Sequence, residues 1–148
     1  MSHYTLQESD YSNLDKNISI AIITAQFNID LTDELEKLNK DFLIQKGFEN
    51  ISIYKVPGAY EIPGMAKHII DTKKIDLIIC LWVVIKWDTP HFDYVCAESA
   101  RWIMNLTINS KIPLMNGIIT CFSKKQVIER LKPVYALSGL NTLVAYNQ

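Results

Sequence analysis

The sequence lacks any apolar run long enough to cross a bilayer. Its longest such run, from Leu77 to Ile85, falls far short of the roughly 20 residues that a membrane-spanning helix needs. The segment from Met1 to Lys16 is polar and mixed in charge, and it has neither the apolar core of a signal peptide nor an Arg-rich amphipathic pattern. These absences predict a protein with no membrane partner, and we expect a cytoplasmic location.

Cysteine is scarce, and charge of neither sign dominates. The three cysteines, Cys80, Cys96 and Cys121, are too few and too widely spaced for a disulfide framework or a CxxC metal site. The formal net charge is −1, from 15 basic and 16 acidic residues, and the lysines are scattered rather than gathered into a basic patch. The sequence therefore predicts reduced thiols, no metal site and no nucleic-acid partner.

Nothing in the composition favours disorder or a second domain. Hydrophobic residues make up 49% and charged residues 21% of the 148 residues, which is the balance of a soluble globular protein. A chain of this length fits one domain, which we expect to span residues 18–148 after a polar N-terminal tail at residues 1–17. Terminal segments of this kind are usually exposed, so we expect the tail to lie outside the core.

Apolar runs rich in β-branched residues alternate with segments of helical spacing. The runs predict strands buried on both faces, at residues 18–25, 51–56, 76–85 and 112–119. The helical spacing predicts a first helix that has Thr32 as its N-cap and ends at Gly47, and a second helix with Pro63 in its first turn. Further helices are predicted at residues 92–110, 124–131 and 137–146.

Strands that alternate with helices form parallel sheets with helices on both faces. The sequence thus predicts an α/β fold of the doubly wound class, a single three-layer α/β/α domain with a four-stranded parallel sheet. Ligands of such sheets bind beyond the carboxyl ends of the strands. The loops that follow the predicted strands are therefore where we expect a functional site.

Aromatic and polar residues follow each predicted strand. Phe27 and Asn28 come after the first strand, Glu61 comes after the second, and His91 comes after the third. The third loop also holds Lys86, Asp88 and Thr89, and the fourth holds Thr120 and Cys121. Together the loops offer an aromatic face for a flat ring, a carboxylate, a cation with a hydroxyl for an anion, and an imidazole able to move protons near pH 7. We interpret them as a site for a flat, anionic small molecule.

Each of these residues also has a purely structural interpretation. Phe27 suits a loop residue that covers the core, and His91 after Pro90 suits a cap of the following helix. Glu61 before Pro63 would favour a helix N-terminus through its charge. A binding site is favoured by the shared location of these residues rather than by any one side chain.

Four segments at these loops carry a family resemblance. They are Ala25-Gln-Phe-Asn28, Val56-Pro-Gly-Ala-Tyr-Glu-Ile-Pro63, Val84-Ile-Lys86 followed by Asp88-Thr-Pro-His-Phe-Asp-Tyr94, and the weaker Gln126-Val-Ile-Glu-Arg130. In their order and spacing, from about residue 18 to residue 131, the chain resembles the lumazine synthase family of riboflavin biosynthesis. The resemblance implies a flavodoxin-like fold with a four-stranded parallel sheet.

The resemblance also implies an activity. Members of the family condense 5-amino-6-ribitylaminouracil with 3,4-dihydroxy-2-butanone 4-phosphate to give 6,7-dimethyl-8-ribityllumazine, phosphate and water, with no metal or organic cofactor. By position, Phe27 would stack on the pyrimidine and His91 would transfer protons. The other implied substrate-binding residues are Asn28, Ala59 and Glu61 at the ribityl chain, Val84, Ile85 and Lys86 at the pyrimidine edge, Asp88 and Thr89 at the phosphate pocket, and Arg130 on the phosphate.

A homo-oligomer is implied in the same way. Family members form pentamers or shells of pentamers, in which a neighbouring subunit completes each site. The resemblance places the neighbour's contribution at residues 114–117. Asn116 stands there, where many relatives have an aromatic residue.

The three tryptophans depart from the family pattern. Trp82, Trp87 and Trp102 stand where the resemblance implies glycine, a residue used where φ is positive or where backbones approach closely. One hypothesis is that the gene carries UGA codons at these positions, which its host reads as glycine. The alternative is a divergent member whose reshaped site has lost activity. UGG codons at the three positions would exclude the first hypothesis.

Three further interpretations stay open. In the first interpretation, the chain is an inactive scaffold that keeps the fold and the assembly. In the second, it is a flavin- or lumazine-binding module that uses Phe27 but not His91. The third interpretation is an archaeal-type riboflavin synthase, which the Pro90 to Tyr94 segment fits less well. Turnover of the two substrates separates the enzyme from the binding module.

Overall fold

A parallel sheet of four strands forms the centre of the structure, a computed structural model that describes residues 5–86 and 90–148. The strands are β1 (Ile20–Ala25), β2 (Ile51–Val56), β3 (Leu77–Ile85) and β4 (Leu114–Cys121). They lie in the order β2-β1-β3-β4, and every neighbouring pair is parallel. The predicted fold class, a three-layer α/β/α fold with a flavodoxin-like sheet, is confirmed.

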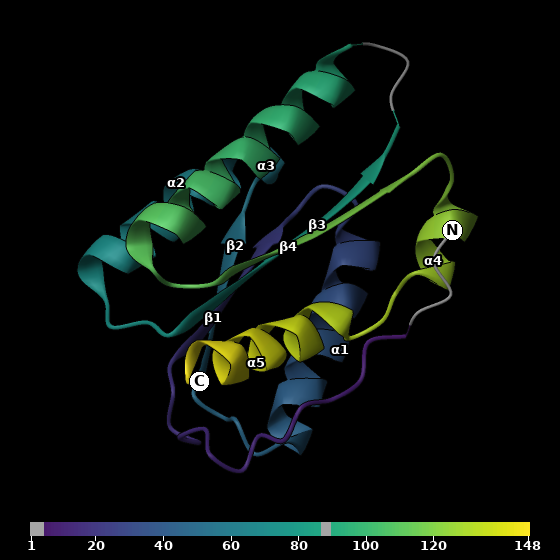
Figure 1. Ribbon diagram of the computed structural model, residues 1–148. Helices are drawn as coiled ribbons and strands as arrows, with labels where there is room; N and C mark the ends of the chain where they lie inside the picture. The colour runs from purple at the N-terminus through teal and green to yellow at the C-terminus, as the bar shows by residue number, and fades with distance from the viewer. Residues whose placement is uncertain (1–4, 87–89) are drawn as a thin grey trace.

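Helices cover both faces of this sheet. They are α1 (Ile29–Gln45), α2 (Ile62–Thr72), α3 (His91–Ser110), α4 (Lys124–Glu129) and α5 (Val134–Tyr146), with a short 3-10 helix, η1 (Ala59–Glu61), ahead of α2. α2 and α3 lie side by side on one face, whereas α1 and α5 cover the other (Figure 1). Within the described ranges, no helix combines the length and the apolar character needed to cross a bilayer.

β1 and β3 are the central strands, and they are buried almost throughout. Every residue of β1 is buried, and Ile85 is the one residue of β3 that is partly exposed. Since helices cover both faces, both sets of alternating side chains must be apolar, and this explains the continuous apolar runs in the sequence. The sheet thereby separates an apolar cluster under α1 and α5 from another under α2 and α3.

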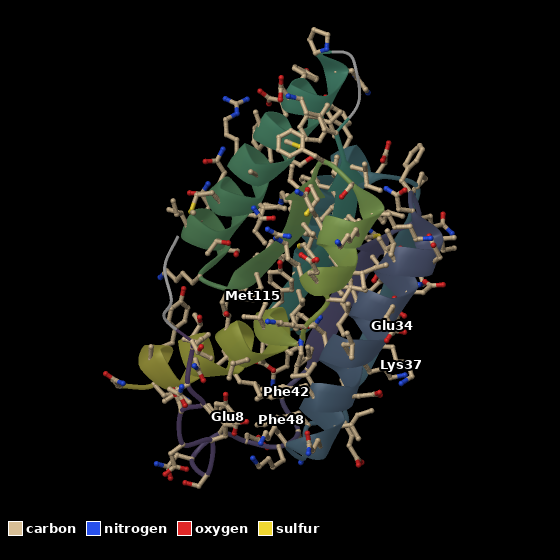
Figure 2. All side chains as sticks on the ribbon, turned by 90° about the vertical axis from the view of Figure 1, so that its right-hand side faces the viewer. Glu8, Glu34, Lys37, Phe42, Phe48 and Met115 are labelled. Carbon is tan, nitrogen blue, oxygen red and sulfur yellow. The ribbon has the colours of Figure 1, made fainter. Side chains whose placement is uncertain are left out.

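The cluster under α1 and α5 includes part of the N-terminal segment. Tyr11 and Leu14 are each 7% exposed there. The Tyr11 hydroxyl donates to Asn141 Oδ1 of α5 over 2.7 Å, and its ring meets the Phe48 ring edge to face. Figure 2 shows Glu8 of this segment and Phe48 at the same end of the molecule. The expectation of an exposed tail is wrong for Tyr11 and Leu14, because both side chains are large and apolar enough to anchor the segment.

Several predicted element ends are also wrong, among them the starts of α1, β4 and α5, the last of which begins at Val134 instead of residue 137. α1 begins at Ile29, and the Thr32 hydroxyl donates to the Ile29 carbonyl inside the helix instead of capping its start. β4 begins at Leu114 instead of residue 112, since Pro113 has no N–H to give to the sheet. Gly47 follows α1 with φ at 93°, and so ends the helix as expected.

Candidate active site

A cavity of about 320 Å³ lies at the carboxyl ends of β1 and β3. The strand order reverses between these two strands, and such a switch point is where open α/β sheets bind ligands. We call this cavity the ring pocket. Its lining residues are Phe27, Asn28, Gly58, Ala59, Tyr60, Glu61, Trp82, Val83, Val84, His91 and Val95. Its volume lies at the small end of the range for ligand pockets, which suits a small ligand.

Phe27 and Glu61 meet beside Gly58. Glu61 Oε2 accepts the Gly58 N–H over 3.0 Å. That oxygen and the edge of the Phe27 ring each lie 3.2 Å from the point where a Cβ on residue 58 would stand. A larger residue at position 58 would therefore displace the ring or the carboxylate. The loops after β1 and β2 thus place Phe27, which is 62% exposed, next to a carboxylate that the Gly58 N–H holds in position.

Asn28 joins the loop after β1 to the end of β3. Its Nδ2 donates to the Val83 carbonyl over 3.0 Å, and its own carbonyl accepts the N–H groups of Leu31 and Thr32. The residue has φ at 57°, in the left-handed region that asparagine tolerates better than most residues. One residue thus makes the turn into α1 and ties two walls of the ring pocket together.

His91 is the first residue of α3 and is exposed on the pocket wall. Val95, one turn further along α3, and Val84, near the end of β3, are buried neighbours on the same wall. A proton-transfer group must come within hydrogen-bond reach of the reacting atoms, and the pocket places the imidazole on the same cavity as the Phe27 face. The structure therefore brings Phe27, Asn28, Ala59, Glu61, Val84 and His91 together.

Other expected site residues near β3 are not in this pocket. Ile85 faces the opposite side of the sheet and packs on the cluster under α1 and α5. Lys86 is exposed, with its Nζ 5.4 Å from the centre of the Phe122 ring. Asp88 and Thr89 lie outside the described residues.

Asn116 and Arg130 are likewise remote from the ring pocket of their own chain. Asn116 is exposed on β4, an edge strand of the sheet. Arg130 is exposed after α4, where its Nη1 donates to the Gln126 carbonyl over 2.9 Å. A single chain does not bring these two residues to Phe27 and His91.

The pocket also contains residues to which the sequence argument gave no role. Tyr60 is one of them, and its ring stacks on that of Tyr94 with 6.3 Å between the ring centres and 23° between the planes. A hydrogen bond with Tyr60 raises the pKa of Tyr94. The position of Tyr60 between Ala59 and Glu61 was a usable signal. No signal in the sequence could place Val95, because its distance from β3 depends on how α3 docks.

Trp82 and Trp102 take ordinary backbone conformations, since neither has a positive φ. Trp82 is 3% exposed, in the same apolar cluster as Ala59 and on the wall of the ring pocket. Trp102 is 49% exposed on α3, with the Arg101 guanidinium 5.3 Å from its ring centre. Backbone conformation therefore does not require glycine at either position, and the codon hypothesis stays a prediction about the gene. Trp87 lies outside the described residues.

The groups that can do chemistry in the described part of the pocket are an imidazole and a carboxylate. The three cysteines are free, and burial raises the pKa of Cys80 to about 12 and also raises that of Cys96, so neither is a ready thiolate. In residues 5–86 and 90–148, no three His, Cys, Asp or Glu side chains converge as metal ligands would. The arrangement is suited to acid–base chemistry on a bound ring.

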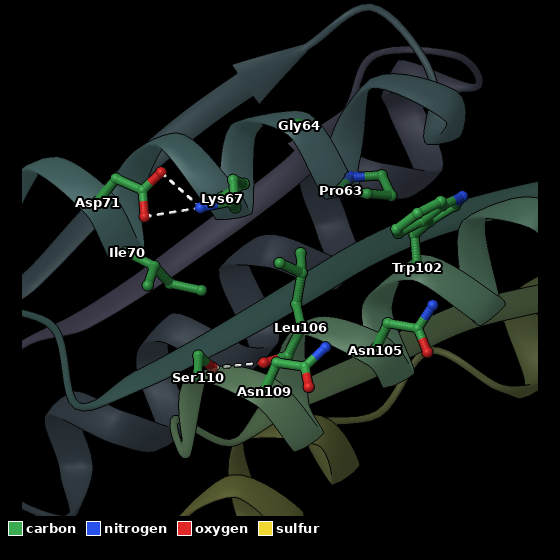
Figure 3. Close-up of a pocket in the computed structure, with 10 residues that line it drawn as sticks. All are labelled: Pro63, Gly64, Lys67, Ile70, Asp71, Trp102, Asn105, Leu106, Asn109 and Ser110. Carbon is green, nitrogen blue, oxygen red and sulfur yellow. Dashed lines mark hydrogen bonds and ion pairs between the residues drawn. The ribbon is translucent and has the colours of Figure 1, made fainter.

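A larger groove of about 580 Å³ lies between α2 and α3 at the surface. Figure 3 shows Pro63 and Lys67 of α2 on one side of this groove, and Trp102 and Leu106 of α3 on the other. The charged groups on its wall, Lys67 and Asp71, pair with each other over 2.7 Å. No imidazole or unpaired carboxylate lines the groove among the described residues, so the ring pocket is the better candidate for an active site.

Fold and site together define a class: a flavodoxin-like α/β protein with acid–base groups and an exposed aromatic ring at the switch point of its sheet. Comparison with known sequences gives the family. The sequence profile of 6,7-dimethyl-8-ribityllumazine synthase matches residues 17–142, and the chain belongs to this family.

Relatives of the same description come from several bacteria. The chain is 46% identical over 120 residues to the 6,7-dimethyl-8-ribityllumazine synthase of Campylobacter jejuni, covering 80% of this chain and 78% of the relative. It is 44% identical over 119 residues to that of Nautilia profundicola, covering 79% and 77%. It is 38% identical over 132 residues to that of Desulfosudis oleivorans, covering 88% and 84%.

Proposed function

We propose that the chain is a transferase that condenses 5-amino-6-ribitylaminouracil with 3,4-dihydroxy-2-butanone 4-phosphate to 6,7-dimethyl-8-ribityllumazine. The family membership supports the proposal. The single observation that carries it in the structure is that His91, Glu61 and the exposed Phe27 ring line one pocket at the switch point of the sheet. The reaction belongs to riboflavin biosynthesis, and for it we propose a cytoplasmic location and no cofactor.

The reaction requires substrate binding and proton transfer, and it requires no nucleophile from the protein. An amine of the uracil attacks the ketone and the adduct loses water to give an imine. Phosphate then leaves, and the second amine closes the new ring with loss of another water. Each step moves protons, which an imidazole can both donate and accept. Holding both substrates in one pocket removes much of the entropic cost of their meeting.

The pocket residues take distinct roles in this proposal. Phe27 stacks on the pyrimidine, and its exposed face supports that role. Glu61, held by the Gly58 N–H, and the backbone of Ala59 bind the ribityl chain. His91 transfers protons. Asn28 joins them at the ribityl chain, Val84 lines the pyrimidine edge, and Asp88 and Thr89 bind at the phosphate.

A direct assay tests the activity. Purified protein is incubated with both substrates, and formation of the lumazine is followed by its fluorescence. Product formation supports the enzyme. Ligand binding without turnover would instead favour the flavin- or lumazine-binding module, and neither binding nor turnover would favour the inactive scaffold.

We further propose that the protein is a homo-oligomer, in a pentamer or an assembly of pentamers. α3 supports this proposal, because it leaves Tyr94, Met104 and Ile108 55%, 59% and 67% exposed. These residues share one side of the helix, with Met104 and Ile108 one turn apart, and exposed apolar side chains gathered on one surface of a soluble protein commonly mark an interface. In this assembly Asn116 and Arg130 serve the site of an adjacent copy.

Two measurements test the assembly. Light scattering should show an oligomer for the unmodified chain and a smaller species for Ile108→Asp. Mixing His91→Ala chains with Arg130→Ala chains should restore part of the activity, because some mixed sites contain both intact residues. A monomer at all concentrations, or no recovery on mixing chains that do co-assemble, contradicts the shared site.

A further inference from the structure

One buried polar side chain interrupts the apolar face that α3 presents to the rest of the molecule. Ser99 is 2% exposed, whereas its neighbours along this face are apolar. The buried residues of α3 are Phe92, Val95, Ser99 and Ile103, spaced three or four positions apart. The other buried polar side chains in the described residues lie in β1 and α1. In the layer of α2 and α3, the described part of the chain thus buries one side-chain hydroxyl.

That hydroxyl is aimed at the loop after β2. Ser99 Oγ donates to the Ala59 carbonyl over 3.2 Å, and Ala59 is itself buried. A buried hydroxyl is unfavourable unless it is hydrogen-bonded, and an alanine would occupy the same place at no such cost. The hydroxyl therefore does more than fill space, because its hydrogen bond fixes the loop at residues 58–61 against α3.

Fixing the Ala59 carbonyl also orients the N–H group of the next residue. The peptide group is planar and trans, so the Tyr60 N–H points away from the side on which Ser99 holds the carbonyl. Tyr60 and Glu61 both line the ring pocket. The direction of the Tyr60 N–H, in a loop that lines the pocket, thus depends on the Ser99 hydroxyl.

A second contact joins the same two elements. The Tyr60 ring stacks on that of Tyr94, which lies on α3 between His91 and Ser99. At 1.5 Å per residue, Ser99 lies about 12 Å along the helix axis from His91. One rigid helix therefore carries the imidazole and also holds the loop that bears Glu61.

We propose that Ser99 is a positioning residue of the active site, which sets the loop at residues 58–61 relative to His91 through its hydrogen bond to Ala59. The proposal rests on the proposed function for its kinetic consequences only. Ser99 has no direct contact with substrate in this role, so its loss should affect substrate binding more than the chemical step.

The test compares Ser99→Ala with Ser110→Ala, a matched serine on the same helix whose hydroxyl donates to the Leu106 carbonyl within α3. Amide hydrogen exchange is measured on both unliganded variants, and KM and kcat are measured in the lumazine assay. For Ser99→Ala we expect about fivefold faster exchange at residues 59–61 and about fivefold higher KM for the uracil, the size of one neutral hydrogen bond. We expect kcat to change less than twofold.

Ser110→Ala controls for a general loss of stability. It should leave loop exchange and KM at their original values, even where it lowers the urea midpoint. Unchanged exchange at residues 59–61 in Ser99→Ala, or an increase matched by Ser110→Ala, overturns the proposal. Failure of the unmodified protein to form product overturns the proposed function instead, and the exchange data still decide on Ser99.

Discussion

The two helical layers of the molecule differ in how they use buried polar groups. Under α1 and α5, such groups join separate elements: Asn39 donates its Nδ2 to the Leu35 carbonyl and accepts the Ala136 N–H at its Oδ1, each over 2.8 Å. Tyr11 and Asn141 make a similar link between the N-terminal segment and α5. Under α2 and α3, the buried polar link among the described residues is the one from α3 to the loop of the ring pocket.

The layers also differ at their outer surfaces. The ring pocket and the larger groove both hollow the α2 and α3 side, and α3 leaves several apolar side chains exposed. The side of α1 and α5 has a hollow of about 450 Å³ beside α5, but its buried polar groups join elements of the chain to one another. The α1 and α5 layer therefore stabilises the fold, while the α2 and α3 layer supplies the ring pocket and the exposed face of α3, on which we propose that ligands and neighbouring copies bind. Changes in the two layers should therefore have different effects.

The largest expected effect is on the α2 and α3 side. His91→Ala should lower kcat by about 10²–10⁴-fold, because it removes the group that we propose transfers protons, and it should change KM much less. Lumazine fluorescence gives both parameters. His68→Ala, an exposed histidine on α2, is the control and should keep full activity. A fall in kcat/KM caused mainly by KM would count against the catalytic role.

The matching change on the α1 and α5 side is Asn39→Ala. It should lower the free energy of unfolding by about 2 kcal/mol, because it leaves the buried Ala136 N–H of α5 without its partner. Urea denaturation measures the change, and kcat and KM should stay the same. Asn50→Ala, whose amide bonds an exposed carbonyl, should change stability by less than about 0.5 kcal/mol. Equal losses in the two variants would refute the role of Asn39.

Two helical glycines give a smaller contrast between the layers. A Cβ on Gly139 of α5 would lie 2.8 Å from Leu77 Cδ2, whereas a Cβ on Gly64 of α2 would meet nothing within 4 Å. Gly139→Ala should therefore destabilise the protein by about 1–3 kcal/mol through overpacking. Gly64→Ala should stabilise it by about 0.5–1 kcal/mol through helix propensity. Thermal unfolding measures both, and shifts of the same sign would remove the contrast.

A comparably small effect is expected at alkaline pH, where the buried thiol of Cys80 in β3 lowers the stability. Burial raises the pKa of Cys80 from 9.0 to about 12, so above pH 9 the unfolded chain releases a proton that the folded chain keeps. The free energy of unfolding should then fall by about 1 kcal/mol between pH 9 and pH 10. Urea midpoints measure the slope, and Cys80→Ala should reduce it, leaving the contribution of Cys96, whose pKa burial also raises. Tyr11, whose pKa burial raises to about 12, adds a similar loss only above pH 10. An unchanged slope in Cys80→Ala would contradict this assignment.

Much of the fold was predictable because its signals are local. Continuous apolar runs mark β1 and β3, Pro63 lies in the first turn of α2, and Gly47 ends α1. The N-cap at Thr32 was wrong because the turn that starts α1 depends on the left-handed conformation of Asn28 and its bond to β3. The burial of Tyr11 was not predictable, since its partners Phe48 and Asn141 are remote in the sequence.

The candidate site also contains some residues whose place the sequence predicts and others whose place it does not. Phe27, Glu61 and His91 follow strands, and the carboxyl ends of parallel strands share one edge, so their meeting at the ring pocket could be expected. Ile85 faces the other side of the sheet because side chains alternate along a strand, and a motif does not state which member faces the ligand. Ser99 and Val95 reach the pocket region through the docking of α3, which no spacing in the sequence encodes.

Local patterns in the chain are enough to set the order of strands and helices and the edge of the sheet where reactive groups gather, because hydrophobic periodicity is legible over a few residues and parallel strands end at one edge. Packing of the layers sets which residues of each strand face the ring pocket, and which helix holds the loop at residues 58–61. It also decides that the N-terminal segment joins the core. Those outcomes depend on contacts between residues far apart in the chain, and such contacts form only when the layers pack.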